Sequence, residues 1–186
     1  MRRIKRYKTE NSKTVLELNI ANLEQLFDKR DPNPYRSKDL DDDIVEYLVS
    51  SAQEVGYRSL GAIEIITQIE MTKEEHQDLD VAIREFFLYR EEITLKQLRT
   101  TFVLGLKTLV IGSTFLSLAI VLPVMIENTW ASEFVDKFLR EGLLLVGWVS
   151  MWKPVNIFLY EWWPLADLAK VFRKLSSLPL RFDSID

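Results

Sequence analysis

The sequence contains no cysteine and only one histidine, His76. Without cysteine the chain can form no disulfide, no thiolate metal site and no cysteine nucleophile. His76 follows Glu74 and Glu75 in the first turn of a predicted helix, where we expect a solvated side chain. A glycine-rich phosphate loop and a nucleophile elbow are also missing. We therefore predict no catalytic residue, no cofactor and no bound metal, and no enzymatic activity.

Charged residues are missing from one long stretch near the middle of the chain. After Lys107 no charged residue occurs from Thr108 to Ile126. These roughly 19 residues, at about 1.5 Å of helix per residue, can cross a hydrocarbon core of about 30 Å. A chain of 186 residues has no core wide enough to bury a helix that is apolar on every side. Residues 101–126 are therefore predicted to form a transmembrane helix.

A second apolar stretch, residues 142–163, contains Lys153 and Pro154 near its middle. We predict a second transmembrane helix here. A re-entrant or interfacial helix is the alternative, because either would tolerate the lysine more easily. Residues 127–141 then form an external loop, and the two helices form a transmembrane hairpin.

Lysines and arginines precede the first apolar stretch and follow the second, whereas the connecting loop is mainly acidic. By the positive-inside rule both termini face the cytoplasm, and we expect the protein in the bacterial inner membrane. Trp130 and the neighbours Trp162 and Trp163 are expected in the two aromatic belts. The basic arm at residues 1–13 lacks the apolar stretch of a signal peptide, and we expect it to bind anionic lipid, not nucleic acid.

The first half of the chain shows strand patterns. Apolar side chains occupy alternate positions in Thr14–Ile20 and in Ala62–Glu70, which predicts two strands, to which Ile4 and Tyr7 can add a third. So few strands leave an open sheet edge that a second subunit can complete. We therefore predict a homo-oligomer.

Helix signals lie between and after these strands. Asp39 is predicted to cap a helix that ends at Gly56. Thr72 and Glu75 form a capping box that opens a long helix, residues 72–100, which either continues into the first apolar helix or hinges before it.

The C-terminal segment, residues 164–186, is predicted to be amphipathic. It lies either in the cytoplasmic membrane interface or on the soluble domain. The predicted fold is thus an α+β cytoplasmic domain at residues 14–100, of two or three strands with helices, fused to a helical transmembrane hairpin.

Polar residues inside the hairpin form a candidate intramembrane site. Lys153 is predicted at the depth of three hydroxyls, and Pro154 cannot donate to the carbonyl of Ser150. The functional interpretation is an ion or ligand pathway, and the alternative is that Lys153 reaches toward the interface while the hydroxyls bond their own helix. The site comprises Lys153, Ser113, Thr114, Ser117 and Ser150, and a second candidate is an interfacial ion pair of Lys107 with Glu161.

Small residues mark the expected packing faces of the two apolar helices, because they allow close approach of the backbones. They lie along one stripe of each helix: Thr101, Gly105, Thr108, Gly112 and Ala119 on the first, and Gly147, Ser150 and Pro154 on the second.

The segment DPNPY followed by DLDDD is the candidate partner-binding surface. A proline-stiffened exposed loop commonly carries binding residues. The aspartates can ligate Mg²⁺, but helix capping explains them without a metal. The candidate residues are Asp31, Pro32, Pro34, Tyr35, Asp39 and Asp41.

The D-P-x-P loop, the D-L-D helix start and the W-x-P…L-Y-x-W-W-P segment together resemble an uncharacterised family of small bacterial proteins with two transmembrane helices. The resemblance covers most of the chain and implies the architecture, with no activity attached. The family-like positions are Asp31, Pro32, Pro34, Asp39, Asp41, Trp152, Pro154, Tyr160, Trp162, Trp163 and Pro164.

The leading hypothesis is a membrane-anchored, homo-oligomeric interaction or scaffold module that presents its α/β domain to the cytoplasm. Its expected partners are membrane lipid, further copies of itself, and a cytoplasmic or membrane protein. The alternative is an oligomeric channel or transporter-like element with Lys153 in the intramembrane path.

Overall fold

The computed structural model describes residues 7–33, 38–68, 71–126 and 133–184. They form two compact units, each described by itself below. Unit 1 is Met1–Thr94 together with Asp167–Asp186, and unit 2 is Leu95–Ala166. In sequence, unit 2 is therefore an insertion within unit 1.

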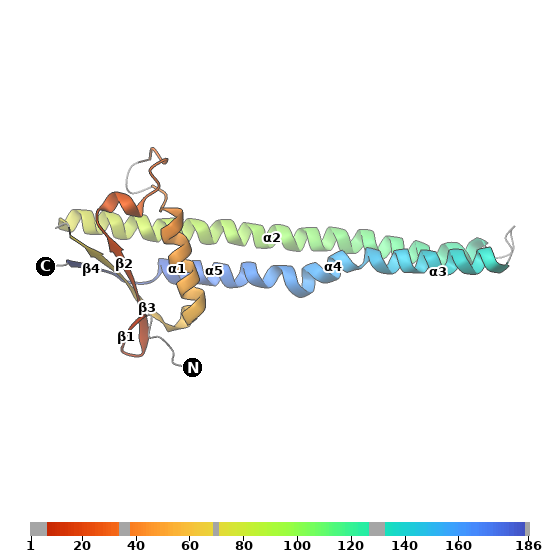
Figure 1. Cartoon of the computed structure of the whole chain (residues 1–186). Coiled ribbons are helices and arrows are strands. Elements are labelled where there is room, and N and C mark those ends of the chain that lie inside the picture. The colour runs from red at the N-terminus through yellow and green to blue at the C-terminus, as the bar shows by residue number, and fades with distance from the viewer. Residues whose placement is uncertain (1–6, 34–37, 69–70, 127–132, 185–186) are drawn as a thin grey trace. The chain divides into compact units, whose positions relative to one another are not determined.

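Unit 1 contains a mixed four-stranded sheet in the order β1-β2-β3-β4 (Figure 1). The strands are β1 (Lys8–Glu10), β2 (Lys13–Ile20), β3 (Leu60–Thr67) and β4 (Leu180–Ser184). β1 and β2 are antiparallel, whereas β2, β3 and β4 are parallel. The sequence predicted two strands, with a third as an option.

Strand β4 was not predicted, although Leu180 and Phe182 alternate with Arg181 and Asp183. The strand is short, follows Pro179, and has its only described partner in β3, more than 100 residues earlier in the chain. The helix before it, α5 (Trp162–Ser176), buries Val171, Phe172 and Leu175 in the core of unit 1. Of the two placements open for residues 164–186, packing on the α/β domain is the one observed.

The first α-helix of unit 1, α1 (Asp42–Val55), begins at a different aspartate from the one predicted. Asp41 is the N-cap, and its side chain accepts a hydrogen bond from the backbone N–H of Asp43 at 3.0 Å. The predicted cap, Asp39, lies in extended chain, because Leu40 forms an antiparallel β-bridge with Phe27. The predicted end is confirmed, since Gly56 follows the helix with φ of +87°, which favours glycine.

Two 3₁₀ turns complete the connections of unit 1. The first, η1 (Leu23–Leu26), is the short helical turn after β2, capped by Asn22. The second, η3 (Tyr57–Ser59), follows Gly56 and leads into β3.

The long helix α2 (Lys73–Ile126) begins at the predicted capping box. The Thr72 backbone N–H donates to Glu75 Oε2 at 2.7 Å, and the Glu75 N–H donates back to Thr72 Oγ1 at 3.2 Å. These reciprocal bonds satisfy donors that the first helical turn leaves open. The helix runs for 54 residues, so of the two alternatives the continuous helix is the one observed.

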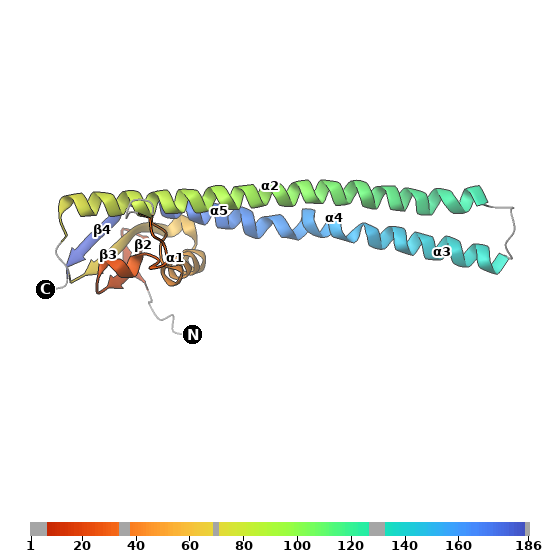
Figure 2. The same ribbon diagram turned by 90° about the horizontal axis from the view of Figure 1, so that it is seen from above.

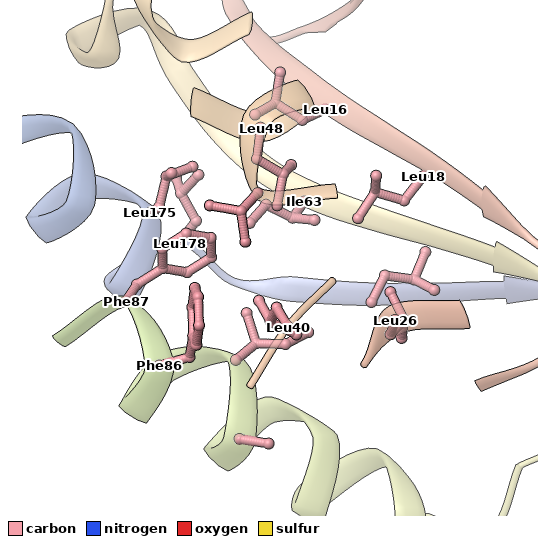
Figure 3. Packing of buried hydrophobic residues seen from close by; sticks show 14 of the residues in the cluster. Leu16, Leu18, Leu26, Leu40, Leu48, Ile63, Phe86, Phe87, Leu175 and Leu178 are labelled. Carbon is pink, nitrogen blue, oxygen red and sulfur yellow. The ribbon is translucent and has the colours of Figure 1, made fainter. Parts of the chain in front are cut away.

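The core of unit 1 lies where one face of the sheet meets α1, α5 and the start of α2 (Figure 3). Leu16, Leu18 and Ile63 come from the strands, Leu48 from α1 and Phe87 from α2. Period-two alternation in β2 and period-3.6 spacing in the helices direct these side chains into one cluster. The predicted inward residues of β2 are confirmed.

An ion pair between an exposed arginine and a nearly buried glutamate joins α2 to α5 within unit 1. The Glu91 side chain is only 10% exposed, and Arg173 Nη2 lies 2.6 Å from its Oε1. The Arg90 guanidinium lies 5.7 Å from the centre of the Phe172 ring, within the range of a cation–π contact. Charged groups thus join the same two helices that the apolar core joins.

In unit 2 the second apolar stretch is an interrupted helix. It consists of α3 (Glu133–Ser150), α4 (Trp152–Asn156), a π-turn η4 (Ile157–Glu161) and the start of α5. Pro154 explains the interruption at Met151, because proline has no N–H for the carbonyl of residue 150. Since α3 begins at Glu133, the later part of the predicted loop at residues 127–141 is helical.

Both views show α2 running beside α3 and α4 within unit 2 (Figures 1 and 2). A Cβ atom added to Gly112 would lie 2.8 Å from the carbonyl oxygen of Ser150, and one on Gly147 would lie 3.0 Å from the Cβ of Ala119. Gly105 similarly faces Ile157 at 2.8 Å. The predicted packing of small residues is therefore confirmed at these positions.

Two helices are long and apolar enough to cross a membrane: Lys73–Met125 and Lys137–Ser176. A core helix of a soluble protein can be as apolar, but it is mostly buried. Here only 17% of the most apolar window of each helix is buried. Most of their large apolar side chains therefore face outward.

The glycine contacts predict the effect of two matched substitutions. Gly112→Ala places a methyl group against backbone at 2.8 Å, whereas Gly142, also in a helix, has nothing within 4 Å of an added Cβ. We expect Gly112→Ala to lower the free energy of unfolding by about 1–3 kcal/mol. Gly142→Ala should leave it unchanged or raise it by up to about 1 kcal/mol. Tryptophan fluorescence during thermal unfolding in detergent measures both, and equal effects would contradict the close crossing.

Candidate functional site

The first candidate site lies in unit 1, at the loop that follows η1. The Asp31 carboxylate accepts hydrogen bonds from the backbone N–H groups of Asn33, at 3.0 Å, and Asp39, at 2.7 Å. The Asp28 N–H also donates to the carbonyl of Asp39 at 2.8 Å. These bonds close the base of the loop, so that Asp31 holds backbone and does not point to a partner.

A groove of about 440 Å³ lies between this loop and α2. Its lining mixes charged, amide and aromatic groups, which suits a polar ligand or a peptide segment better than a lipid chain. Tyr89 at its rim is 56% exposed. The lining residues are Asn33, Lys38, Asp39, Ala82, Glu85, Phe86 and Tyr89.

The predicted partner-binding residues therefore separate into different roles. Asp39 lines the groove, whereas Asp31 closes the loop and Asp41 caps α1. Pro32 is exposed beside the groove residue Asn33. The other two predicted residues, Pro34 and Tyr35, lie outside the described residues.

The acidic run Asp39–Asp43 is not arranged as a metal site. Within residues 7–33, 38–68, 71–126 and 133–184, no group of three or more histidine, cysteine, aspartate or glutamate residues is placed to hold a metal ion. His76, predicted to be solvated, is half-buried, because its ring stacks on Phe182 at 4.3 Å between centroids.

The second candidate site lies in unit 2, at the π-turn. Lys153 Nζ donates to Glu161 Oε1 at 2.7 Å, and Asn156 Nδ2 donates to the same oxygen at 2.6 Å. A π-turn brings residues five apart onto one side of the helix, which explains how Asn156 reaches Glu161. We call Lys153, Asn156 and Glu161 the polar cluster.

The observed bonds to Glu161 come from Lys153 and Asn156, both through Oε1, and the ion pair of Glu161 with Lys107 stays a prediction. Pairing Lys107 with Glu161 assumes that both apolar stretches are regular α-helices. The π-turn changes the spacing between Lys153 and Glu161, and the long lysine side chain reaches along its own helix.

The predicted hydroxyl partners of Lys153 are elsewhere. Thr114 Oγ1 donates to the carbonyl of Val110 at 2.8 Å, and Ser150 Oγ donates to the carbonyl of Gly147 at 2.6 Å. Ser113, Thr114 and Ser117 line a separate shallow groove along α2. The structure therefore does not bring Lys153 together with Ser113, Thr114, Ser117 or Ser150.

An apolar groove of about 500 Å³ lies beside the polar cluster in unit 2, and we call it the aromatic groove. Sequence reasoning missed it. A signal was present, because several of its residues recur every four positions along one helix face. The lining residues are Leu116, Trp148, Met151, Trp152, Val155, Asn156 and Tyr160.

Comparisons with protein-family models, curated proteins and solved structures found no match to this chain. The resemblance to small bacterial two-helix membrane proteins stays a prediction.

The loop of unit 1 contains an ion pair, between Asp28 and Arg30, that should weaken at low pH. Arg30 donates to both carboxylate oxygens of Asp28, with Nη2 2.8 Å from Oδ2 and Nε 2.9 Å from Oδ1. This ion pair lowers the pKa of Asp28 from 3.8 to about 2. Because the pKa of Asp28 is lower in the folded protein than in the unfolded chain, the ion pair stabilises the fold fully at a pH above the unfolded pKa. This stabilisation is lost as the pH falls through the folded pKa.

We therefore expect Arg30→Ala to destabilise the protein at pH 6, and the difference from the natural sequence to shrink between about pH 4 and pH 2. Lys29→Ala removes a positive charge from the adjacent position and serves as the control. Thermal midpoints at pH 6, 4, 3 and 2 measure the effect. A difference that stays constant with pH would show that Arg30 does not act through Asp28.

Proposed function

We propose that the chain is a membrane-anchored interaction module. In this proposal α2 and α3–α4 cross the bilayer as a hairpin, and unit 1 lies in the cytoplasm. The outward apolar side chains of both helices support the crossing, as does their glycine-mediated packing. The basic residues at both ends of the apolar insertion support the cytoplasmic placement of unit 1, in a bacterial inner membrane.

The observation that carries the interaction role is the groove beneath the loop of unit 1. Asp31 closes the loop through two backbone hydrogen bonds, so that Asp39 and Asn33 face the groove from a rigid support. The exposed ring of Tyr89 offers the kind of aromatic contact that is enriched at protein interfaces. The partner that fits such a groove is a peptide segment carrying both polar and aromatic groups.

The sheet supports self-association as a further part of the proposal. β4 stands at one end of the strand order, and β3 is its only neighbour among the described strands. An edge strand presents unpaired N–H and C=O groups that a second copy can pair. A homo-oligomer would also present several grooves to one multivalent partner.

Photo-crosslinking tests the interaction role. We expect a photoreactive phenylalanine analogue at Tyr89, in the full chain in native membranes, to crosslink a partner in several-fold higher yield than the same analogue at Glu17. Glu17 is exposed on β2, away from the groove lining. Asp39→Ala should reduce the Tyr89 crosslink. Equal yields at both positions would overturn the role of the groove.

A second candidate function is an oligomeric channel, and one observation favours it. Lys153 and Glu161 are 54% and 33% exposed on an otherwise apolar helix, a surface that an oligomer can turn inward. This function predicts ion flux in proteoliposomes that falls with Lys153→Met and stays unchanged with Lys107→Met. Absence of flux from verified oligomers would exclude it in favour of the anchor.

A further inference from the structure

We propose that the aromatic groove and the polar cluster together bind one phospholipid whose headgroup is a zwitterion with a primary amine. One acyl chain would lie in the groove, with the headgroup at the cluster. This inference rests on the proposed crossing of the bilayer by α3 and α4, because only then does the groove face lipid.

The groove has the character of an acyl-chain site. It has the volume of a small-molecule site, about 500 Å³, and its lining is almost entirely apolar. Trp148, Trp152 and Tyr160 stand out from the helix and are each about two-thirds exposed. Rigid aromatic walls of this kind confine a flexible chain at low entropic cost to the protein.

The groove is continuous with the polar cluster. Asn156 both lines the groove and donates to Glu161 at 2.6 Å, so the chain site ends where the charged groups begin. A phospholipid has the same order of parts, with an apolar chain that leads to a charged headgroup.

The charges of the cluster select among headgroups. The hydrogen bond of Lys153 Nζ to Glu161 uses one of the three donors that an ammonium has. Oε1 of Glu161 accepts the bonds from both Lys153 and Asn156, and these bonds leave Oε2 open. A headgroup with one net charge would meet repulsion from one of the two residues. A zwitterion matches both, with its phosphate at Lys153 and its ammonium at Glu161.

A primary ammonium fits better than a quaternary one. The open acceptor is a carboxylate oxygen, which forms a strong hydrogen bond with an N–H donor. A quaternary ammonium has no such donor and is recognised by aromatic cages. The aromatic rings of Trp148, Trp152 and Tyr160 line the apolar groove, and Glu161 is not among the lining residues of that groove.

The position of the cluster along the helix suits a headgroup. Lys153 extends toward Glu161, which directly precedes Trp162 and Trp163. Trp162 Nε1 donates to the carbonyl of Phe158 at 2.9 Å. Tryptophan pairs commonly lie at the level of the lipid headgroups, so the charged groups are at the depth where phosphate and ammonium groups occur.

Native mass spectrometry of the full chain, released from nanodiscs, tests the proposal. The nanodiscs contain equal amounts of phosphatidylethanolamine, phosphatidylcholine and phosphatidylglycerol. We expect one phosphatidylethanolamine retained per chain in preference to the other two lipids. Glu161→Gln should reduce that preference about tenfold, the scale of one lost charge-assisted hydrogen bond.

Two substitutions that add bulk distinguish lipid binding in the aromatic groove from general contact of the helices with lipid. Val155→Trp fills the aromatic groove and should abolish the retention, whereas Val121→Trp lies in the shallow groove along α2 and should not. Equal retention of all three lipids, or equal effects of the two substitutions, would overturn the proposal. So would a change in oligomeric mass with Val155→Trp at an unchanged lipid count, since a second copy would then occupy the groove.

Alkaline carbonate extraction of native membranes distinguishes a failure of the membrane crossing from a failure of the lipid site. If carbonate releases the chain, the membrane crossing fails and the lipid site fails with it. If the chain stays inserted but retains no lipid selectively, only the lipid site fails.

Discussion

The parallel pairing of β3 with β4 is the constraint on which the rest of the structure depends. Ile63 pairs with Leu180, and between these strands the chain runs through the whole of α2, α3, α4 and α5. A parallel connection ordinarily needs one crossover helix, but here the crossover contains unit 2. The sheet of unit 1 is therefore complete only after the apolar insertion has been made, which gives the fold many contacts between distant residues.

Irregular backbone and polar side chains occur together in the second apolar helix. Pro154 removes the donor for the Ser150 carbonyl, and that carbonyl approaches Gly112 of α2, where any side chain would collide with it. After this crossing in the chain, the π-turn brings Asn156 and Glu161 together. Lys153 donates to the same glutamate, eight residues further along its own helix. One helix thus carries a tight packing face and a charged outward face.

Each unit has its own candidate for recognition. In unit 1 the carboxylate of Asp31 holds a loop above a polar groove, which suits a peptide. In unit 2 an apolar groove ends at a charged pair, which suits a lipid. Both candidates fit the proposed membrane-anchored module, which would bind a protein partner through unit 1 and a lipid through unit 2.

The sequence by itself determined the features that depend on neighbouring residues. These include the capping box at Thr72, the end of α1 at Gly56, the alternation in β2, and the apolar character of the two long helices, because local hydrogen bonding and hydrophobic period act within a few residues. Small residues also identified the helix contact faces. The tertiary structure alone decided the cap at Asp41, the strand β4, the partner of Glu161 and both grooves. Each depends on distant pairing or on a departure from regular α-helix, namely the Phe27–Leu40 bridge, the β3–β4 ladder and the π-turn. Residue spacing shows the alternation in β4 and the repeat along the aromatic groove, but it does not show which distant residues pair or where a helix becomes irregular.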